Sequence, residues 1–198
     1  MARKPESVLE LGCARGYIGK RLQDVGIKWA GLEVSKHCYL TRVCEGIKLF
    51  DLCQTQTIST PGAGDSGKIF PFASHVRSNA EPSLNYDHPF DLCFSVATFE
   101  HVPEDKLPAV LSEMKRTCKR GLHGIDFGEK DDGFDKTHCT LKSKDWWLKL
   151  FREHGLENHE IVNKEELEQG TLTPDVLNGD GKVKLNVGSF ITMFHPGW

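Results

Sequence analysis

Short apolar runs alternate with segments of helical periodicity along most of this chain of 198 residues. Apolar runs bounded by polar or turn-forming residues are typical of strands that are buried in a sheet. Seven runs of this kind predict strands, at 7–11, 28–34, 47–53, 90–99, 121–127, 156–164 and 184–195.

Apolar residues spaced three or four positions apart predict helices between these strands, at 17–26, 35–46, 103–119 and 143–155. In the first helix, Ile18, Leu22 and Val25 should share the buried face. Ser35 is the expected N-cap of the second helix. In the third, Asp105 as the N-cap would place Pro108 in the first turn, where a proline is tolerated. The consecutive Trp146 and Trp147 cannot share a helix face, so we expect one in the core and the other beside a cleft.

Five strands, four of them followed by a predicted helix, precede the two strands that close the chain. This order predicts an α/β fold with a mostly parallel, doubly wound sheet and helices on both faces. We expect one domain over residues 1–198, with a flexible insertion at about 54–89, where Ser, Thr, Pro, Gly and Asn replace the apolar pattern. Ligands of such sheets bind at the carboxyl ends of the strands.

The turn after the first strand is the strongest chemical signal. Gly12 and Gly16 allow a tight turn and a close approach of the backbone to a ligand, and the N–H groups of the next helix face the same place. The spacing is neither the G-x-G-x-x-G of dinucleotide folds nor the G-x-x-x-x-G-K-[ST] of phosphate loops. A match to the latter at 62–68 lacks both the Ser or Thr and a preceding apolar strand, so we interpret it as a loop.

The stretch Glu10-Leu-Gly-Cys-Ala-Arg-Gly16 resembles the first motif of class I S-adenosylmethionine-dependent methyltransferases, (D/E)-x-G-x-G-x-G, with Ala14 in place of the middle glycine. The fourth predicted strand and the residues directly after it, with Phe90, Asp91 and Glu100-His-Val, are similar to another motif of that family. The resemblance covers about residues 8–194. It implies a Rossmann-like sheet of about seven strands whose last strand is antiparallel to the others.

The resemblance also implies a site for S-adenosyl-L-methionine. Glu33, at the end of the second strand, would bind the ribose hydroxyls, and Asp51, after the third, would contact the adenine amino group. The residues that we expect at the cofactor are Glu10, Gly12, Cys13, Ala14, Gly16, Tyr17, Glu33, Val34, Asp51, Leu52 and Ser95.

The expected enzyme is therefore a methyltransferase with an unidentified acceptor, for which a small molecule is favoured. The chain lacks the N-P-P-(Y/F) motif of methyltransferases that act on amino groups of nucleic acid, and its net charge of -3 does not favour nucleic acid as a partner. A base is needed only if the acceptor must lose a proton. His101, after the fourth strand, and His138, in the segment 128–140 after the fifth, are the two candidates for this catalytic role.

Other features limit the compartment and the partners. Seven scattered cysteines without a CxxC pair indicate reduced thiols, and no run reaches the length of a membrane span, so we expect a cytoplasmic protein with no membrane contact. The adjacent His–Cys pairs at 37–38 and 138–139 lack the ligand spacing of zinc sites, so we expect no metal. Members of the family carry helices before the first strand, so we expect such a cap to come from a longer chain, from the insertion at about 54–89 or from a partner subunit.

Two alternatives differ in class from an active methyltransferase. A cofactor-binding or interaction module with this fold but without independent catalysis is favoured by the short stretch before the first strand. It is disfavoured by the intact set of Gly12, Gly16, Glu33 and Asp51. An NAD(P)-dependent oxidoreductase is disfavoured by the missing dinucleotide motif.

Overall fold

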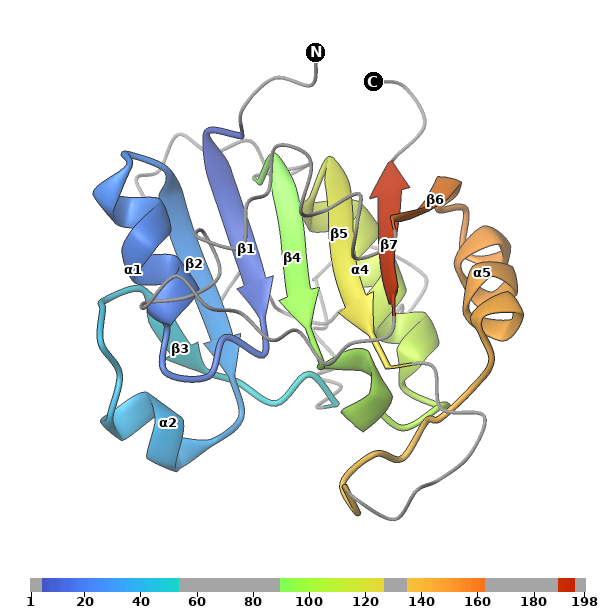
Figure 1. Ribbon diagram of the computed structural model, residues 1–198, viewed down its shortest axis with the longest axis horizontal. Helices are drawn as coiled ribbons and strands as arrows, with labels where there is room; N and C mark the ends of the chain where they lie inside the picture. Colours follow the sequence, from blue (N-terminus) through green and yellow to red (C-terminus); the bar gives the residue numbers. More distant parts are fainter. Residues whose placement is uncertain (1–4, 54–89, 127–134, 163–188, 195–198) are drawn as a thin grey trace, which may run out of the picture.

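A seven-stranded sheet forms the centre of the molecule in a computed structural model, which describes residues 5–53, 90–126, 135–162 and 189–194. The predicted insertion at 54–89, the loop at 62–68 and Phe134 lie outside the described residues. The strands are β1 (Ser7–Leu11), β2 (Lys28–Glu33), β3 (Ile47–Leu49), β4 (Leu92–Val96), β5 (Arg120–Ile125), β6 (Glu157–Val162) and β7 (Ser189–Phe194). Their order in the sheet is β3-β2-β1-β4-β5-β7-β6 (Figure 1).

The strands β1 to β5 run parallel to one another, whereas β7 is antiparallel to both of its neighbours. The predicted α/β sheet with an antiparallel last strand is therefore confirmed. Leu11 at the end of β1 pairs with Leu32 of β2 on one side and with Ser95 of β4 on the other. This register brings the segments that leave β1, β2 and β4 together at one edge of the sheet.

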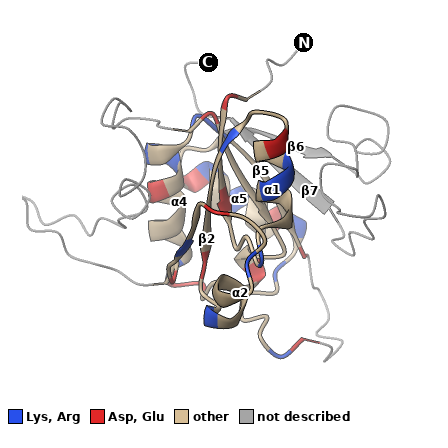
Figure 2. Cartoon of the chain, turned by 90° about the vertical axis from the view of Figure 1, so that its left-hand side faces the viewer, with Lys and Arg blue, Asp and Glu red and all other residues tan. Residues whose placement is uncertain are grey.

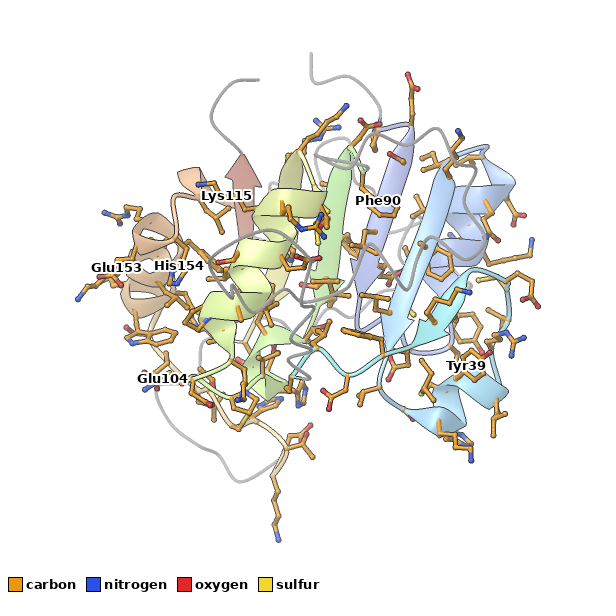
Figure 3. The ribbon with its side chains drawn as sticks, turned by 180° about the vertical axis from the view of Figure 1, so that it is seen from behind. Tyr39, Phe90, Glu104, Lys115, Glu153 and His154 are labelled. Carbon is orange, nitrogen blue, oxygen red and sulfur yellow. The ribbon has the colours of Figure 1, made fainter. Side chains whose placement is uncertain are left out.

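The helices are α1 (Tyr17–Asp24), α2 (Lys36–Leu40), α4 (Leu107–Thr117) and α5 (Lys144–Glu153), with a short 3-10 turn η2 (Phe99–His101) after β4. On one face of the sheet, α4 and α5 pack against alternate strand residues such as Leu9 and Leu32. On the other face, Leu22 of α1 packs with Val8 and Trp29. Helices thus cover both faces, as Figures 1 and 3 show from opposite sides.

Several local predictions can be checked against these helices. The face of α4 is confirmed, because Leu107, Val110, Leu111 and Met114 are all buried. Trp147 is the core residue of its pair and Trp146 is partly buried.

Two local predictions are wrong. Val25 is 59% exposed, because α1 ends at Asp24 and Val25 leaves the helix as its C-cap. Asp105 is not the N-cap of α4, since Lys106 occupies that position.

The charged side chains around α1, α2 and β2 are of both signs and are interspersed over this side of the molecule (Figure 2). None of the helices in the described part of the chain combines the length and the apolar composition needed to cross a membrane.

Candidate functional site

The turn between β1 and α1 has an unusual backbone. Gly12, Ala14 and Gly16 all have positive φ angles, of 67°, 48° and 81°. A Cβ atom on Gly12 would lie 2.4 Å from Oγ1 of Thr98, the residue two positions after β4. Thr98 itself donates to the carbonyl oxygens of Leu11 and Val96 at 3.1 Å. The turn is therefore packed against the end of β4 so closely that only glycine fits at position 12.

Glu33 at the end of β2 holds this turn directly. Its Oε2 accepts a hydrogen bond from the N–H of Ala14 at 2.7 Å, and its Oε1 accepts one from the N–H of Ser35 at 2.7 Å. The side chain is buried. A carboxylate has about four lone-pair positions, so two protein donors leave acceptor capacity for a ligand. The fold thus brings two parts of the sequence-predicted site, Ala14 and Glu33, into contact.

Glu10 lies below the turn, within β1, and is 4% exposed. Its Oε2 accepts a hydrogen bond from Nε1 of Trp29 at 2.9 Å. Burial raises the pKa of Glu10 to about 8, and the neighbouring Glu33 adds to this rise, although the bond from Trp29 opposes it. Near neutral pH the group is therefore mostly a neutral acid that bonds β1 to β2.

The N-terminus of α1 faces the same edge. Ser35 caps α2 through Cys38, and Ser143 caps α5 through Trp146. By contrast, no side chain among the described residues caps α1, which begins after Gly16 and has no acid in its first turn. Uncapped N–H groups of a first helical turn are well placed to bind an anion.

The other residues expected at the cofactor lie at different depths along this edge. Asp51 accepts a hydrogen bond from the N–H of Cys53 at 2.8 Å in the segment after β3. Tyr17 and Val34 are exposed, whereas Cys13 and Leu52 are buried.

Ser95, the remaining member of the expected set, is fully buried within β4, and its hydroxyl lies 2.6 Å from Nδ1 of His123 on β5. Burial lowers the pKa of His123 to about 3, so this imidazole is neutral. The Ser95 hydroxyl therefore lies against a buried side chain of the neighbouring strand. Its predicted role at the cofactor stays a prediction.

A second polar cluster lies beyond the end of β4. Glu100, His101 and His138 each offer a ligand atom, and the three atoms lie within 4.8 Å of one another. We call these three residues the imidazole cluster. Glu100 is fully buried, and burial raises its pKa to about 7. The two predicted catalytic histidines are thus brought together from segments 37 positions apart, with ring centroids 4.6 Å apart.

The proton position on His101 follows from its hydrogen bonds. Oγ1 of Thr137 donates to Oδ1 of Asp135 at 2.6 Å, and it lies 2.9 Å from Nδ1 of His101. The hydrogen bonds from Thr137 lower the pKa of Asp135, which therefore stays an acceptor. Because the single hydroxyl proton of Thr137 goes to Asp135, Nδ1 of His101 must donate. The lone pair of the neutral imidazole is then on Nε2.

The segment that carries His138 is anchored to η2 by its backbone. The N–H groups of Cys139 and Thr140 both donate to the carbonyl oxygen of Glu100 at 2.9 Å. Oγ1 of Thr140 donates to the carbonyl oxygen of Val102 at 2.7 Å. These bonds fix the position of His138 relative to Glu100.

An ion pair adds to this anchoring. Nζ of Lys142 lies 2.7 Å from Oε2 of Glu104, which follows η2 and is labelled in Figure 3. Bonds between η2 and the segment before α5 therefore hold the residues of the imidazole cluster close together.

Comparison with known proteins identifies the architecture. No protein-family model and no curated protein matches the chain. A solved methyltransferase from Archaeoglobus fulgidus that depends on S-adenosylmethionine is similar over 96% of this chain and 86% of its own, with a TM-score of 0.60 and 14% identity. The fold is that of class I S-adenosylmethionine-dependent methyltransferases.

Two further structures share this methyltransferase fold at 14% identity and a TM-score of 0.59. One is the methyltransferase chain in a complex with the Trm112 methyltransferase activator of Haloferax volcanii, with 98% of this chain and 83% of that chain covered. The other is phosphoethanolamine N-methyltransferase 2 of Haemonchus contortus, in a complex with phosphomonomethylethanolamine and S-adenosylhomocysteine, with 99% and 50% covered.

The methyltransferase fold contains polar residues that the sequence analysis missed. Each of the following contacts a residue of the predicted site: Trp29 bonds to Glu10, Thr98 packs against Gly12, Thr137 bonds to His101, and Asp135 lies 3.7 Å from His138. For Thr137 and Asp135, their positions one and three residues before His138 were a usable signal. For Trp29 and Thr98 no local pattern points to the contact, because the site residue that each one meets lies far away along the chain.

Proposed function

We propose that this protein is a methyltransferase that uses S-adenosyl-L-methionine to methylate a small acceptor molecule. The observation that carries the proposal is the contact between Glu33 and the N–H of Ala14, which joins the acid after β2 to the glycine turn after β1. A turn with three positive φ angles, braced by a carboxylate that keeps acceptor capacity, suits a polar ligand with hydroxyl donors.

The residues at this edge match the parts of such a cofactor. The free lone pairs of Glu33 would accept hydrogen bonds from the ribose hydroxyls, and the carboxylate of Asp51 would accept one from the adenine amino group. The uncapped N-terminus of α1 would bind the carboxylate of the amino-acid part. When bound, the cofactor supplies a methyl group that its sulfonium already activates.

The chain must then align the acceptor with this methyl group and exclude water. The imidazole cluster lies after β4, beside Thr98, and Thr98 contacts the turn. An acceptor at the cluster would therefore lie next to the cofactor. If it must lose a proton, Nε2 of His101 carries the lone pair that would accept it.

Replacement of Glu33 tests the cofactor site. The Glu33→Ala variant should bind S-adenosylhomocysteine about 10-fold to 1000-fold more weakly, since two charge-assisted hydrogen bonds are lost. Titration calorimetry measures the affinity, and circular dichroism and urea unfolding check that the variant is folded. The exposed Glu45, whose partner is Arg42, provides the matched control Glu45→Ala with unchanged affinity.

Wild-type protein that binds neither S-adenosylmethionine nor S-adenosylhomocysteine would contradict the proposal, as would comparable binding of NAD. Turnover with a panel of small hydroxyl, amine and thiol acceptors, with RNA as a further arm, then separates an enzyme from a binding module. A module would bind the cofactor and produce no S-adenosylhomocysteine with any acceptor.

A further inference from the structure

One buried carboxylate oxygen of the imidazole cluster has no hydrogen-bond partner among the described residues. Glu100 is fully buried, and while its Oε1 accepts from the N–H of Asp126 at 3.3 Å, its Oε2 is unpaired. A buried polar atom without a partner destabilises a fold, so in native proteins such an atom usually meets a ligand, a water or an ion.

The neighbours of this oxygen are also lone-pair donors. Ligand atoms of His101 and His138 lie with that of Glu100 within 4.8 Å, yet no hydrogen bond joins any two of the three residues in the described part of the chain. An electron-pair acceptor between them would satisfy all three, and a metal cation is such an acceptor. We propose that Glu100, His101 and His138 bind one divalent metal ion.

The groups behind the two imidazoles support this assignment. Metal-binding histidines commonly donate their other N–H to a carboxylate or to another oxygen, which orients the ring. His101 donates through Nδ1 to Thr137, which in turn donates to Asp135. Oδ2 of the same Asp135 lies 3.7 Å from Nε2 of His138. One carboxylate therefore lies behind both rings.

The dimensions and the access of the cluster are also suitable. Ligand atoms about 2.0–2.2 Å from a zinc-sized ion lie about 3–4 Å from one another, so small rotations of the partly exposed imidazoles would close the site. The side chain of His138 is 16% exposed, so an ion can reach the cluster from solvent. Glu100 is fully buried and forms the inner wall of the cluster. Two imidazoles and one carboxylate favour manganese, iron, cobalt or zinc over magnesium or calcium.

Three protein ligands leave coordination positions open. If the proposed methyl transfer is correct, an oxygen of the acceptor would occupy one of them, so the acceptor would be a hydroxyl compound or a compound that chelates through oxygen. This last step rests on the proposed function, whereas binding of the metal does not. With the metal bound, Nε2 of His101 would be a ligand, so His101 would hold the ion in place of acting as the base.

Cobalt and manganese provide the test on the full chain, after treatment with a chelator and desalting. We expect one equivalent of Co²⁺ to give the visible absorption of a protein-bound ion, and one equivalent of Mn²⁺ to lose its free-ion electron paramagnetic resonance signal. Loss of a partner behind a ligand weakens binding about 10-fold to 100-fold, which is the effect expected for Thr137→Val. His138→Ala removes a ligand and Glu100→Gln replaces a charged ligand with a neutral amide, so each should weaken binding at least about 100-fold.

The exposed His37 on α2 supplies the matched control, and His37→Ala should bind both ions as the wild type does. Because His138 lies outside the core, its variant keeps the test valid even if Glu100→Gln fails to fold. Wild-type protein that binds S-adenosylhomocysteine but takes up neither ion would overturn the metal site alone. Equal metal affinity in the wild type and in His138→Ala would overturn it as well.

Discussion

The glycine turn and the imidazole cluster lie at the same edge of the sheet, but their polar groups are satisfied in different ways. In the turn, both oxygens of Glu33 are bonded to backbone N–H groups, and Gly12 is packed against Thr98. In the imidazole cluster, Oε2 of Glu100 lacks a partner within the described residues. The carboxylate of the turn is thus paired within the protein, whereas the buried oxygen of the cluster is left for a ligand, a water or an ion.

The largest expected effect tests how rigidly the turn is built. Gly12→Ala adds a Cβ atom that meets Thr98 at 2.4 Å, on a backbone with a φ of 67°. Thr98 cannot rotate away without losing its bonds to Leu11 and Val96. Left-handed strain together with overpacking should lower the free energy of unfolding by about 2–5 kcal/mol, and cofactor binding should be lost. Urea unfolding and calorimetry measure the two effects.

Gly26 offers a control that separates strain from crowding. It has a similar φ of 77°, but an added Cβ would meet nothing within 4 Å. Gly26→Ala should therefore lower the free energy of unfolding by only about 1–2 kcal/mol and leave cofactor affinity unchanged. If Gly12→Ala proves no more damaging than Gly26→Ala, the contact with Thr98 does not hold the turn.

A smaller effect, in the dependence on pH, concerns Glu10 below the turn. Burial raises its folded-state pKa from 4.5 to about 8, so folding takes up a proton between these values. This contribution to stability is complete below about pH 4.5, is lost progressively as the pH rises to about 8, and does not change further above that. Glu10→Gln still offers an oxygen to Trp29 but cannot ionise, so the free energy of unfolding of the variant should fall less over this range.

The other titratable groups near Glu10 should not obscure the difference in pH dependence between the wild type and Glu10→Gln. Burial raises the pKa of Cys13 and of Cys44, so both thiols stay neutral over the range. Glu33 is the charged neighbour, and it is present in both proteins. Glu100, whose pKa is about 7, adds the same slope to both. Urea unfolding at several pH values should show a difference of up to a few kcal/mol, and parallel curves would show that Glu10 ionises normally in the fold.

The two regions also differ in how far the sequence predicted them. The glycine turn and Glu33 follow from local motifs, because chain direction and parallel pairing bring the ends of neighbouring strands together. The imidazole cluster does not follow, since Glu100 and His138 meet only through bonds between η2 and the segment before α5. A search for closely spaced metal ligands therefore found nothing there.

Apolar periodicity predicted the buried residues correctly within α4. The four apolar residues of α4 that were expected in the core are buried. It failed at the end of α1, where Val25 has the right spacing but the helix has already ended. Helix ends depend on backbone hydrogen bonds and on the direction of the following strand, which apolar spacing does not encode.

The smallest expected effect compares two alanines with positive φ, one in each region. Ala14 in the turn and Ala97 after β4 both have a φ of 48°, a conformation that an alanine adopts with a strain of about 1–2 kcal/mol. Glycine relieves this strain but gives the unfolded chain more freedom, worth about 0.4–1 kcal/mol. Ala14→Gly and Ala97→Gly should therefore raise the free energy of unfolding by about 1 kcal/mol or less, whereas the control Ala109→Gly within α4 should lower it by about 0.5–1 kcal/mol. Chemical denaturation resolves these signs, and a loss of stability in Ala14→Gly or Ala97→Gly comparable to that of the control would mean that the left-handed backbone there is not strained.

The two variants Ala14→Gly and Ala97→Gly should also differ in their effects on ligand binding. Ala14→Gly keeps the N–H that Glu33 accepts, so cofactor affinity should stay unchanged. Ala97→Gly frees the segment that leads through η2 to His101, so it should weaken metal binding if the backbone there positions the cluster.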